Sequence, residues 1–136
     1  MILADTSAWV EYDRATGSPA ESRLAELIAN SGDLAITEPV VMEVLAGARD
    51  ETRATSLRRL LLRARLIPFE AVADFEGAAR LYRRCRQAGV TSRGMVDCMI
   101  ATVALRTGSS LLSHDLDLSR IATVVNLELD PASLVR

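Results

Sequence analysis

The segment Met1-Ile-Leu-Ala-Asp5-Thr-Ser7 joins a short apolar run to a carboxylate at the point where the run ends. Met1–Ala4 has the composition of a buried strand, and Thr6 or Ser7 can cap a short helix that follows it. The segment therefore predicts a strand–helix unit with Asp5 at the carboxyl end of the strand. Ligands of open α/β sheets bind at that end.

Short strand-like runs alternate with longer helical patterns along the rest of the chain. Further strands are predicted at Leu34–Ile36, Leu66–Phe69, Ser110–Leu112 and Thr123–Val125. Helices are predicted from Ser18 to about Gly32, from Thr37 to about Gly47, over Asp50–Arg65, Ala71–Gln87 and Gly94–Arg106, and as a single turn over Leu118–Ile121. The periodicity of residues 71–87 predicts that the buried face of this helix carries Val72, Phe75, Ala79 and Tyr82. This alternation predicts an α/β fold, a three-layer sandwich whose central parallel sheet of about four to five strands is flanked by helices.

Other acidic residues lie in unusually apolar surroundings. They are Glu43 within Pro39-Val-Val-Met-Glu-Val-Leu-Ala46, Asp97 within Met95-Val-Asp-Cys-Met-Ile-Ala101, and Asp115 after Leu111-Leu-Ser-His, with Asp117 two residues on. A carboxylate in an apolar segment costs several kcal/mol unless it is paired, hydrogen-bonded or bound to a metal. Asp5 and Asp115 fall at predicted strand ends, and the helices of Glu43 and Asp97 can direct these residues to the same edge. The sequence therefore predicts a cluster of carboxylates.

Four of these five acidic residues also have a purely structural interpretation. Asp5 could cap the helix after the first strand, and Asp115 or Asp117 could cap the turn at 118–121. Asp97 could form a salt bridge with Arg93, one helical turn earlier. These alternatives stay open at the level of the sequence.

A cluster of carboxylates needs a cation, because such groups cannot all stay ionised close together. Oxygen-only ligands select hard metals such as Mg²⁺ or Mn²⁺, and the absence of paired His and Cys residues argues against zinc. A metal held by a few carboxylates usually completes its shell with water and substrate phosphates. The pattern therefore indicates metal-assisted phosphodiester hydrolysis.

Composition excludes several other classes of protein. The 136 residues match the commonest size of one domain, and 49% apolar with 25% charged residues is typical of a soluble globular protein. All 16 basic residues are Arg, so a P-loop lysine or a Schiff-base lysine is missing, and the single His114 argues against a Ser/His/Asp triad. No apolar stretch approaches the roughly 20 residues of a membrane span. The reduced thiols expected at Cys85 and Cys98, and the lack of a basic leader, favour a cytoplasmic protein.

Taken in order, these segments resemble the PIN-domain ribonucleases, and most of all the VapC toxins of bacterial toxin–antitoxin pairs. The resemblance rests on Asp5-Thr-Ser, on Glu43 in Val-Val-Met-Glu-Val-Leu-Ala-Gly, on Asp97 in Met-Val-Asp-Cys-Met-Ile-Ala, and on Leu-Leu-Ser-His-Asp115-Leu-Asp117-Leu. It covers essentially the full chain, and it implies a single PIN domain over residues 1–136 with a PIN-like sandwich fold.

The resemblance also implies roles for individual residues. The catalytic acids map onto Asp5, Glu43, Asp97 and Asp115, and Asp5, Asp97 and Asp115 are the implied metal ligands. Candidate accessory residues are Asp117, Thr6, Ser7, Ser113 and Arg93. Ser113 stands where the family more usually has Thr, and Leu118 stands where an aromatic residue usually follows the last acid.

The implied activity is endonucleolytic cleavage of structured cellular RNA, either tRNA or rRNA, with Mg²⁺ as cofactor and Mn²⁺ as a substitute. The implied partners are a cognate VapB-like antitoxin that neutralises the toxin and a second copy in a homodimer, within a toxin–antitoxin assembly. No association with a membrane is implied.

Two alternatives compete with this interpretation. A phosphatase of the haloacid dehalogenase type would need an Asp-x-Asp motif at the first strand, whereas Thr6 and Ser7 follow Asp5 here. A non-catalytic PIN-like binding module would be expected to have lost one of the acids, and this chain retains all of them.

Overall fold

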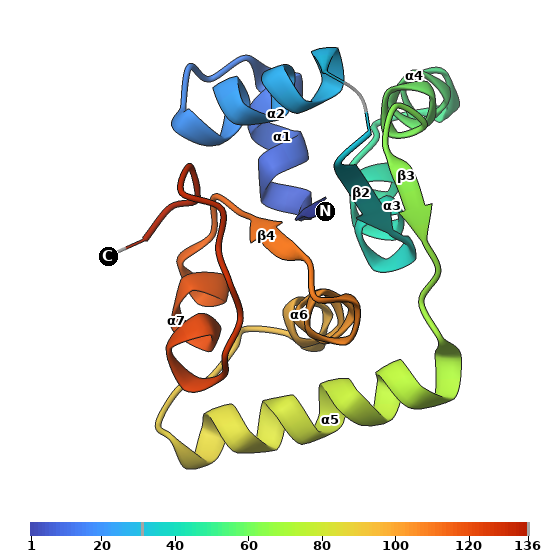
Figure 1. The fold of residues 1–136 in the computed structure, drawn as a ribbon. Helices are drawn as coiled ribbons and strands as arrows, with labels where there is room; N and C mark the ends of the chain where they lie inside the picture. Colours follow the sequence, from blue (N-terminus) through green and yellow to red (C-terminus); the bar gives the residue numbers. More distant parts are fainter. Residues whose placement is uncertain (31, 136) are drawn as a thin grey trace.

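The computed structural model describes residues 1–30 and 32–135, which form an α/β fold around a central parallel sheet (Figure 1). The strands are β1 (Ile2–Ala4), β2 (Leu34–Thr37), β3 (Arg65–Ile67) and β4 (Ser110–Leu112). The helices are α1 (Thr6–Arg14), α2 (Pro19–Ala29), α3 (Glu38–Ala46), α4 (Glu51–Leu61), α5 (Ala71–Gln87), α6 (Met95–Thr107) and α7 (Leu116–Val124). The strand order is β3-β2-β1-β4, and every pairing is parallel. The predicted fold class and sheet are confirmed.

The sheet lies between two groups of helices. Figure 1 shows α1 with α2 on one side of the strands and α6 with α5 on the other. Strands covered on both faces are apolar along their whole length, and Leu3, Ala4, Leu111 and Leu112 are all fully buried. Among the described residues, no helix is both long and apolar enough to cross a membrane.

The register of the two central strands determines where the first acid lies. Leu3 pairs with Leu111 and Ala4 with Leu112, so β1 and β4 end side by side. The amide of Asp5 donates to the carbonyl of Leu112 at 3.0 Å and continues the pairing for one more step. The residues that follow both strands are therefore close neighbours at the carboxyl edge of the sheet.

The C-terminal part of the chain differs from the prediction. Residues 123–124 belong to α7 rather than to a strand, because Leu118 and Ile121 on its inner face are fully buried and extend the expected single turn into a helix. Burial of an apolar helix face overrides the strand preference of β-branched residues. The strand-like contact comes later, where Leu111 donates to the carbonyl of Glu128 at 2.9 Å and accepts from the amide of Asp130 at 2.8 Å.

The end of α4 also differs from the prediction. The helix expected over Asp50–Arg65 ends at Leu61, and Arg65 already belongs to β3. A helix cannot continue where the chain turns to pair with β2, and Arg65 pairs there with Ala35.

The buried face of α5 is rotated from its predicted position. Val72 and Phe75 are 74% and 55% exposed. The buried residues are instead Asp74, Ala78, Leu81 and Cys85. Gly77 lies against α6 so closely that a Cβ atom there would be 2.7 Å from the methyl group of Thr102. This close approach and a buried ion pair of Asp74 set the rotation of the helix.

The ion pair of Asp74 joins α5 to α6. Arg106 donates from Nε to Asp74 Oδ1 at 2.9 Å and from Nη2 to Oδ2 at 2.8 Å. The same guanidinium donates to the carbonyl of Pro68, and the amide of Glu70 donates to Asp74. A bidentate contact between a guanidinium and a carboxylate is among the stronger charge-assisted interactions in proteins. It fixes the turn between β3 and α5 against α6.

Candidate active site

The predicted acids lie together at the carboxyl edge of the sheet. Asp5 follows β1 directly, and Asp115 lies three residues after β4. Glu43 is on α3, and Asp97 is in the first turn of α6. Asp97 is close enough to the other acids for their charges to raise its pKa. The structure therefore brings together residues that are far apart in the sequence.

Asp5 is buried, and hydrogen bonds hold it on both carboxylate oxygens. The hydroxyl of Ser7 donates to Oδ1 at 2.7 Å, the hydroxyl of Ser113 donates to Oδ2 at 2.7 Å, and the amide of Ala8 donates to Oδ1 at 3.0 Å. Asp5 is thus the N-cap of α1, in place of Thr6 or Ser7. Burial raises the pKa of Asp5 to about 6, although the three hydrogen bonds act in the opposite direction.

The predicted accessory hydroxyls all contact the cluster. Thr6 donates to Glu43 Oε1 at 2.6 Å. The hydroxyl oxygen of Ser7 accepts a hydrogen bond from the amide of His114 at 2.7 Å, and that of Ser113 accepts one from the amide of Asp115 at 3.1 Å. Because Ser7 and Ser113 also donate to Asp5, the ends of β1 and β4 are connected through side chains. These contacts determine the orientation of the carboxylates before any ligand binds.

Asp97 differs from Asp5 because its carboxylate accepts no hydrogen bond from the residues that the structure describes. Burial, and after it the charges of Asp115, Asp5 and Glu43, together raise the pKa of Asp97 to about 7. The predicted alternative of a salt bridge with Arg93 is wrong, because Arg93 pairs with Asp117. Such a carboxylate needs either a proton or a metal cation.

Asp115 and Asp117 have different surroundings although they are two residues apart. Asp115 is the N-cap of α7, and its Oδ1 accepts a hydrogen bond from the amide of Asp117 at 2.8 Å. Asp117 is 5% exposed and accepts from Arg93 Nε at 3.0 Å and from Arg120 Nη1 at 2.9 Å. Burial alone would raise the pKa of Asp117, but the hydrogen bond and charge of Arg93, with the charge of Arg120, hold it below its usual value.

Arg120 is a site residue that the sequence analysis does not identify. Its position three residues after Asp117 is the spacing at which side chains meet on a helix, and this spacing was the available signal. Arg93, a predicted accessory residue, lies in the loop before α6 and contacts Asp117 rather than Asp97.

The carboxylates have the composition of a site for a hard divalent cation. One oxygen each from Asp97, Asp115 and Asp117 lies within 4.8 Å of the other two. Mg²⁺ binds carboxylate oxygens and keeps several waters, so it does not require a complete cage of protein ligands. The fit is best for Asp97 and Asp115, since both oxygens of Asp117 already accept from arginines.

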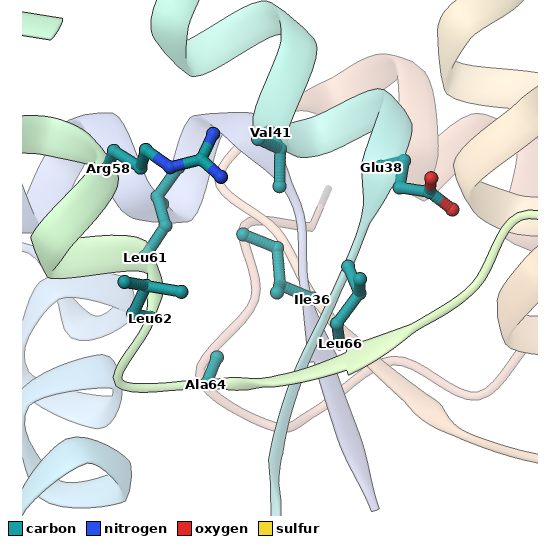
Figure 2. A pocket seen from close by; sticks show the side chains of 8 residues that line it. All are labelled: Ile36, Glu38, Val41, Arg58, Leu61, Leu62, Ala64 and Leu66. Carbon is teal, nitrogen blue, oxygen red and sulfur yellow. The ribbon is translucent and has the colours of Figure 1, made fainter. Parts of the chain in front are cut away.

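One hollow adjoins the acidic site, and a second hollow lies apart from it. An open hollow next to the acids is lined by Ser7, Arg93, His114, Asp115, Leu116, Arg120 and Leu134. A separate apolar hollow of about 300 Å³ lies between the end of α4 and the edge of the sheet, with Arg58 and Glu38 toward its two sides (Figure 2). None of the acidic cluster lines that second hollow, so it is distinct from the site.

Comparison with known proteins gives consistent matches. A family model described as the PIN domain matches residues 2–124. The chain is 43% identical over 129 residues to ribonuclease VapC11 of Mycobacterium tuberculosis, covering 94% of this chain and 96% of that protein. It is 38% identical over 116 residues to ribonuclease VapC32 of the same species, covering 85% of each.

Solved structures show the same fold at lower identity. VapBC2 from Rickettsia felis, bound to a promoter DNA fragment, has a TM-score of 0.76 and 22% identity, covering 98% of this chain and 99% of that chain. VapC20 of Mycobacterium tuberculosis, described as a sarcin-ricin loop cleaving toxin, has a TM-score of 0.68 and 19% identity. The match covers 94% of this chain and 99% of that chain.

Proposed function

Because the chain belongs to the PIN-domain family and is a VapC-type toxin, we propose that it is a metal-dependent endoribonuclease that inhibits translation and growth. The observation that carries the proposal is the carboxylate of Asp97, which lacks a hydrogen-bond donor among the described residues and has its pKa raised to about 7. A site organised in this way favours the binding of a divalent cation.

The proposed ligands are Asp5, Asp97 and Asp115, and hydrogen bonds from Ser7 and Ser113 hold Asp5 in place. When bound, Mg²⁺ or Mn²⁺ lowers the pKa of a coordinated water and stabilises the leaving oxygen. Glu43 Oε1 accepts from Thr6, which orients the side chain and leaves Oε2 to take the proton of the attacking water. These hydroxyl contacts hold the carboxylates of Asp5 and Glu43 in place.

The proposed substrate is structured cellular RNA, either tRNA or rRNA. The relatives that share 38–43% identity are named as ribonucleases. One protein with the same fold is described as cleaving the sarcin-ricin loop, which supports this class of substrate. The proposed inhibitor is a cognate VapB-like antitoxin, because proteins with this fold have been solved as VapBC complexes. We place the activity in the cytoplasm and in a single PIN domain over the whole chain.

Cleavage is expected to require a divalent metal and to weaken at low pH. Protons compete with the metal for Asp5, whose pKa is about 6, and for Asp97, whose pKa is about 7. Between pH 8 and pH 6 the protonation of Asp97 should lower the apparent Mn²⁺ affinity about tenfold, and the protonation of Asp5 adds roughly a further factor of two. Calorimetric Mn²⁺ titrations at both pH values measure this effect.

Incubation of the same purified protein with total cellular RNA tests the ribonuclease activity. We expect cleavage with Mg²⁺ or Mn²⁺ and none in excess EDTA, with recovery when metal is restored. Cleavage that persists in EDTA, or Mn²⁺ binding that does not change between pH 6 and pH 8, would contradict the metal mechanism. A protein that binds Mn²⁺ but leaves RNA intact would instead favour a non-catalytic PIN-like binding module.

We also propose a homodimer, supported by an exposed apolar surface on α3, α5 and α6. Met42 and Phe75 are 53% and 55% exposed. Phe69 and Phe75 pack edge to face at 4.8 Å beside a hollow of about 340 Å³ that Met42 and Met99 also line. Adjacent exposed apolar groups of this kind mark interaction surfaces in soluble proteins.

Phe75→Glu is expected to convert the dimer into a monomer, because a carboxylate at the centre of this surface would be desolvated without a partner. The molar mass from light scattering after size-exclusion chromatography measures the change. Leu62→Glu is the matched control, since Leu62 is 73% exposed on a different part of the surface. A Phe75→Glu protein that remains dimeric would place the interface elsewhere.

A further inference from the structure

Two arginines meet at one buried carboxylate beside the acidic site. Arg93 precedes α6 and Arg120 lies on α7, and each donates to a different oxygen of Asp117. The side chain of Asp117 is 5% exposed, whereas those of Arg93 and Arg120 are 84% and 55% exposed. The charged ends of both arginines therefore reach solvent while their common partner is enclosed.

This group has an excess of positive charge. Two guanidinium groups and one carboxylate give these three side chains a net charge of +1. One guanidinium is sufficient to neutralise the carboxylate of Asp117. The charges of Asp115 and Asp97 also act on Arg93, but neither carboxylate forms an ion pair with an arginine among the described residues.

The arginines also keep unused hydrogen-bond donors. A guanidinium has five N–H groups. Arg93 uses Nε and Arg120 uses Nη1 on Asp117, and no further hydrogen bond joins either guanidinium to a residue that the structure describes. Because a planar guanidinium fixed at one edge presents its other edge in a defined direction, Asp117 reduces the entropy that either arginine loses when it binds an anion.

The free donors border the hollow that adjoins the site. Ser7, Arg93, Asp115 and Arg120 all line it, so a polymer held at the carboxylates can continue directly into this space. Two arginines can contact a phosphate through paired N–H groups, which is the geometry of the stronger phosphate contacts in proteins. His114 lines the same hollow and adds a further polar group.

We propose that Arg93 and Arg120, oriented by Asp117, bind the RNA phosphate that neighbours the scissile phosphate. The inference rests on the proposed ribonuclease function and extends it by assigning a substrate-binding role to three residues. It makes Asp117 a positioning residue rather than a metal ligand. It also explains why a carboxylate beside the metal ligands has both of its oxygens paired with arginines.

The test measures RNA binding without cleavage. A short fluorescein-labelled single-stranded RNA is titrated by fluorescence anisotropy against Asp97→Asn protein in EDTA, over a range of NaCl concentrations. Arg93→Ala and Arg120→Ala are each expected to weaken binding about tenfold at low salt, since a hydrogen bond to a charged group is worth roughly 1.5–3 kcal/mol. Each should also reduce the salt slope by about 0.7. Arg83→Ala, an exposed arginine on α5, is the matched control and should change binding less than twofold.

The Asp117→Asn variant tests whether RNA binding depends on the orientation of the two arginines or only on the net charge of the site. Removing a negative charge should strengthen RNA binding if only net charge matters, whereas loss of the oriented arginines should weaken it severalfold. The same substitution in the protein with Asp97 intact should leave Mn²⁺ affinity within about twofold of the wild-type value, unlike the loss expected for a ligand. Thermal melts confirm that each variant is folded.

Different results would overturn the two proposals. RNA binding of Arg93→Ala and Arg120→Ala that equals that of Arg83→Ala, tighter RNA binding by Asp117→Asn, or loss of Mn²⁺ binding in Asp117→Asn would each overturn the phosphate site. Failure of the wild-type protein to cleave RNA with metal present would overturn the ribonuclease function alone, because the binding measurements use neither metal nor cleavage.

Discussion

Asp97→Asn protein is expected to cleave RNA at least about 10³-fold more slowly than the wild type and, when free of metal at pH 8, to be more stable than it. The loss of activity follows because a catalytic metal supplies several kcal/mol of stabilisation to the transition state, and each 1.36 kcal/mol is a factor of ten in rate. The gain in stability follows because the ionised carboxylate lies among other acids with no hydrogen-bond donor in the described structure.

The sign of the stability change comes from the pKa. The pKa of Asp97 is about 7 in the folded protein and close to 3.8 in the unfolded chain. The folded state therefore binds more protons between about pH 4 and pH 7, and the stability of the metal-free protein falls as the pH rises through that window. Asn removes this loss. Since Asp97 is only partly buried, solvent screening limits the gain to about 1–2 kcal/mol.

Thermal melts in EDTA at pH 5 and pH 8 measure the effect, with a shift of roughly 3–5 °C for each kcal/mol. The wild type should lose stability between these pH values more than Asp97→Asn does. Mn²⁺ should stabilise the wild type and not the variant. Asp33→Asn is the matched control, because Asp33 is exposed immediately before β2, at the edge of the sheet opposite the cluster. Wild-type activity in Asp97→Asn, or lower stability at pH 8, would refute the assignment.

Arg106→Leu is expected to destabilise the protein by about 3 kcal/mol, because it leaves the carboxylate of Asp74 buried without its cation. The side chain of Asp74 is 2% exposed, and its only other hydrogen bond in the described structure comes from the amide of Glu70. Burial alone would raise the pKa of Asp74, but the contacts of Arg106 and of the Glu70 amide hold it below its usual value. Its stabilisation is therefore present at neutral pH and is lost as the pH falls through the folded pKa.

Urea denaturation of the single and double variants measures this effect. Asp74→Leu combined with Arg106→Leu should recover most of the lost stability, since an apolar pair of similar volume often replaces a buried ion pair without cost. Arg59→Ala removes an exposed arginine on α4 and should stay within about 0.5 kcal/mol of the wild type. If Arg106→Leu is as stable as Arg59→Ala, the pair does not hold α5 against α6.

The acidic site could be predicted from the sequence because each acid interrupts an apolar run. Glu43 and Asp97 have apolar or small neighbours on the same helix face, so their cost is visible without knowledge of the fold. Asp5 and Asp115 follow strand-like runs, and the carboxyl edge of a parallel sheet brings such positions together. The alternation of strands and helices was sufficient to predict that edge.

The partners of the charged residues could not be predicted in the same way. Asp74 pairs with Arg106, 32 residues away, and Asp117 pairs with Arg93, 24 residues away. Periodicity along α5 placed Val72 and Phe75 inward, although the ion pair and the close approach at Gly77 turn the helix the other way. Local patterns record which residues share a face of a helix, but not which face another element covers.

The sequence by itself determined the α/β alternation, the parallel sheet and the set of carboxylates that gather at its edge. Only the tertiary structure decided what each carboxylate contacts there: hydroxyls for Asp5, two arginines for Asp117, and no hydrogen-bond donor among the described residues for Asp97. The physical reason is that the free energy of a buried charge depends on the distance to its counter-charges. Packing between elements that are remote in the sequence sets that distance.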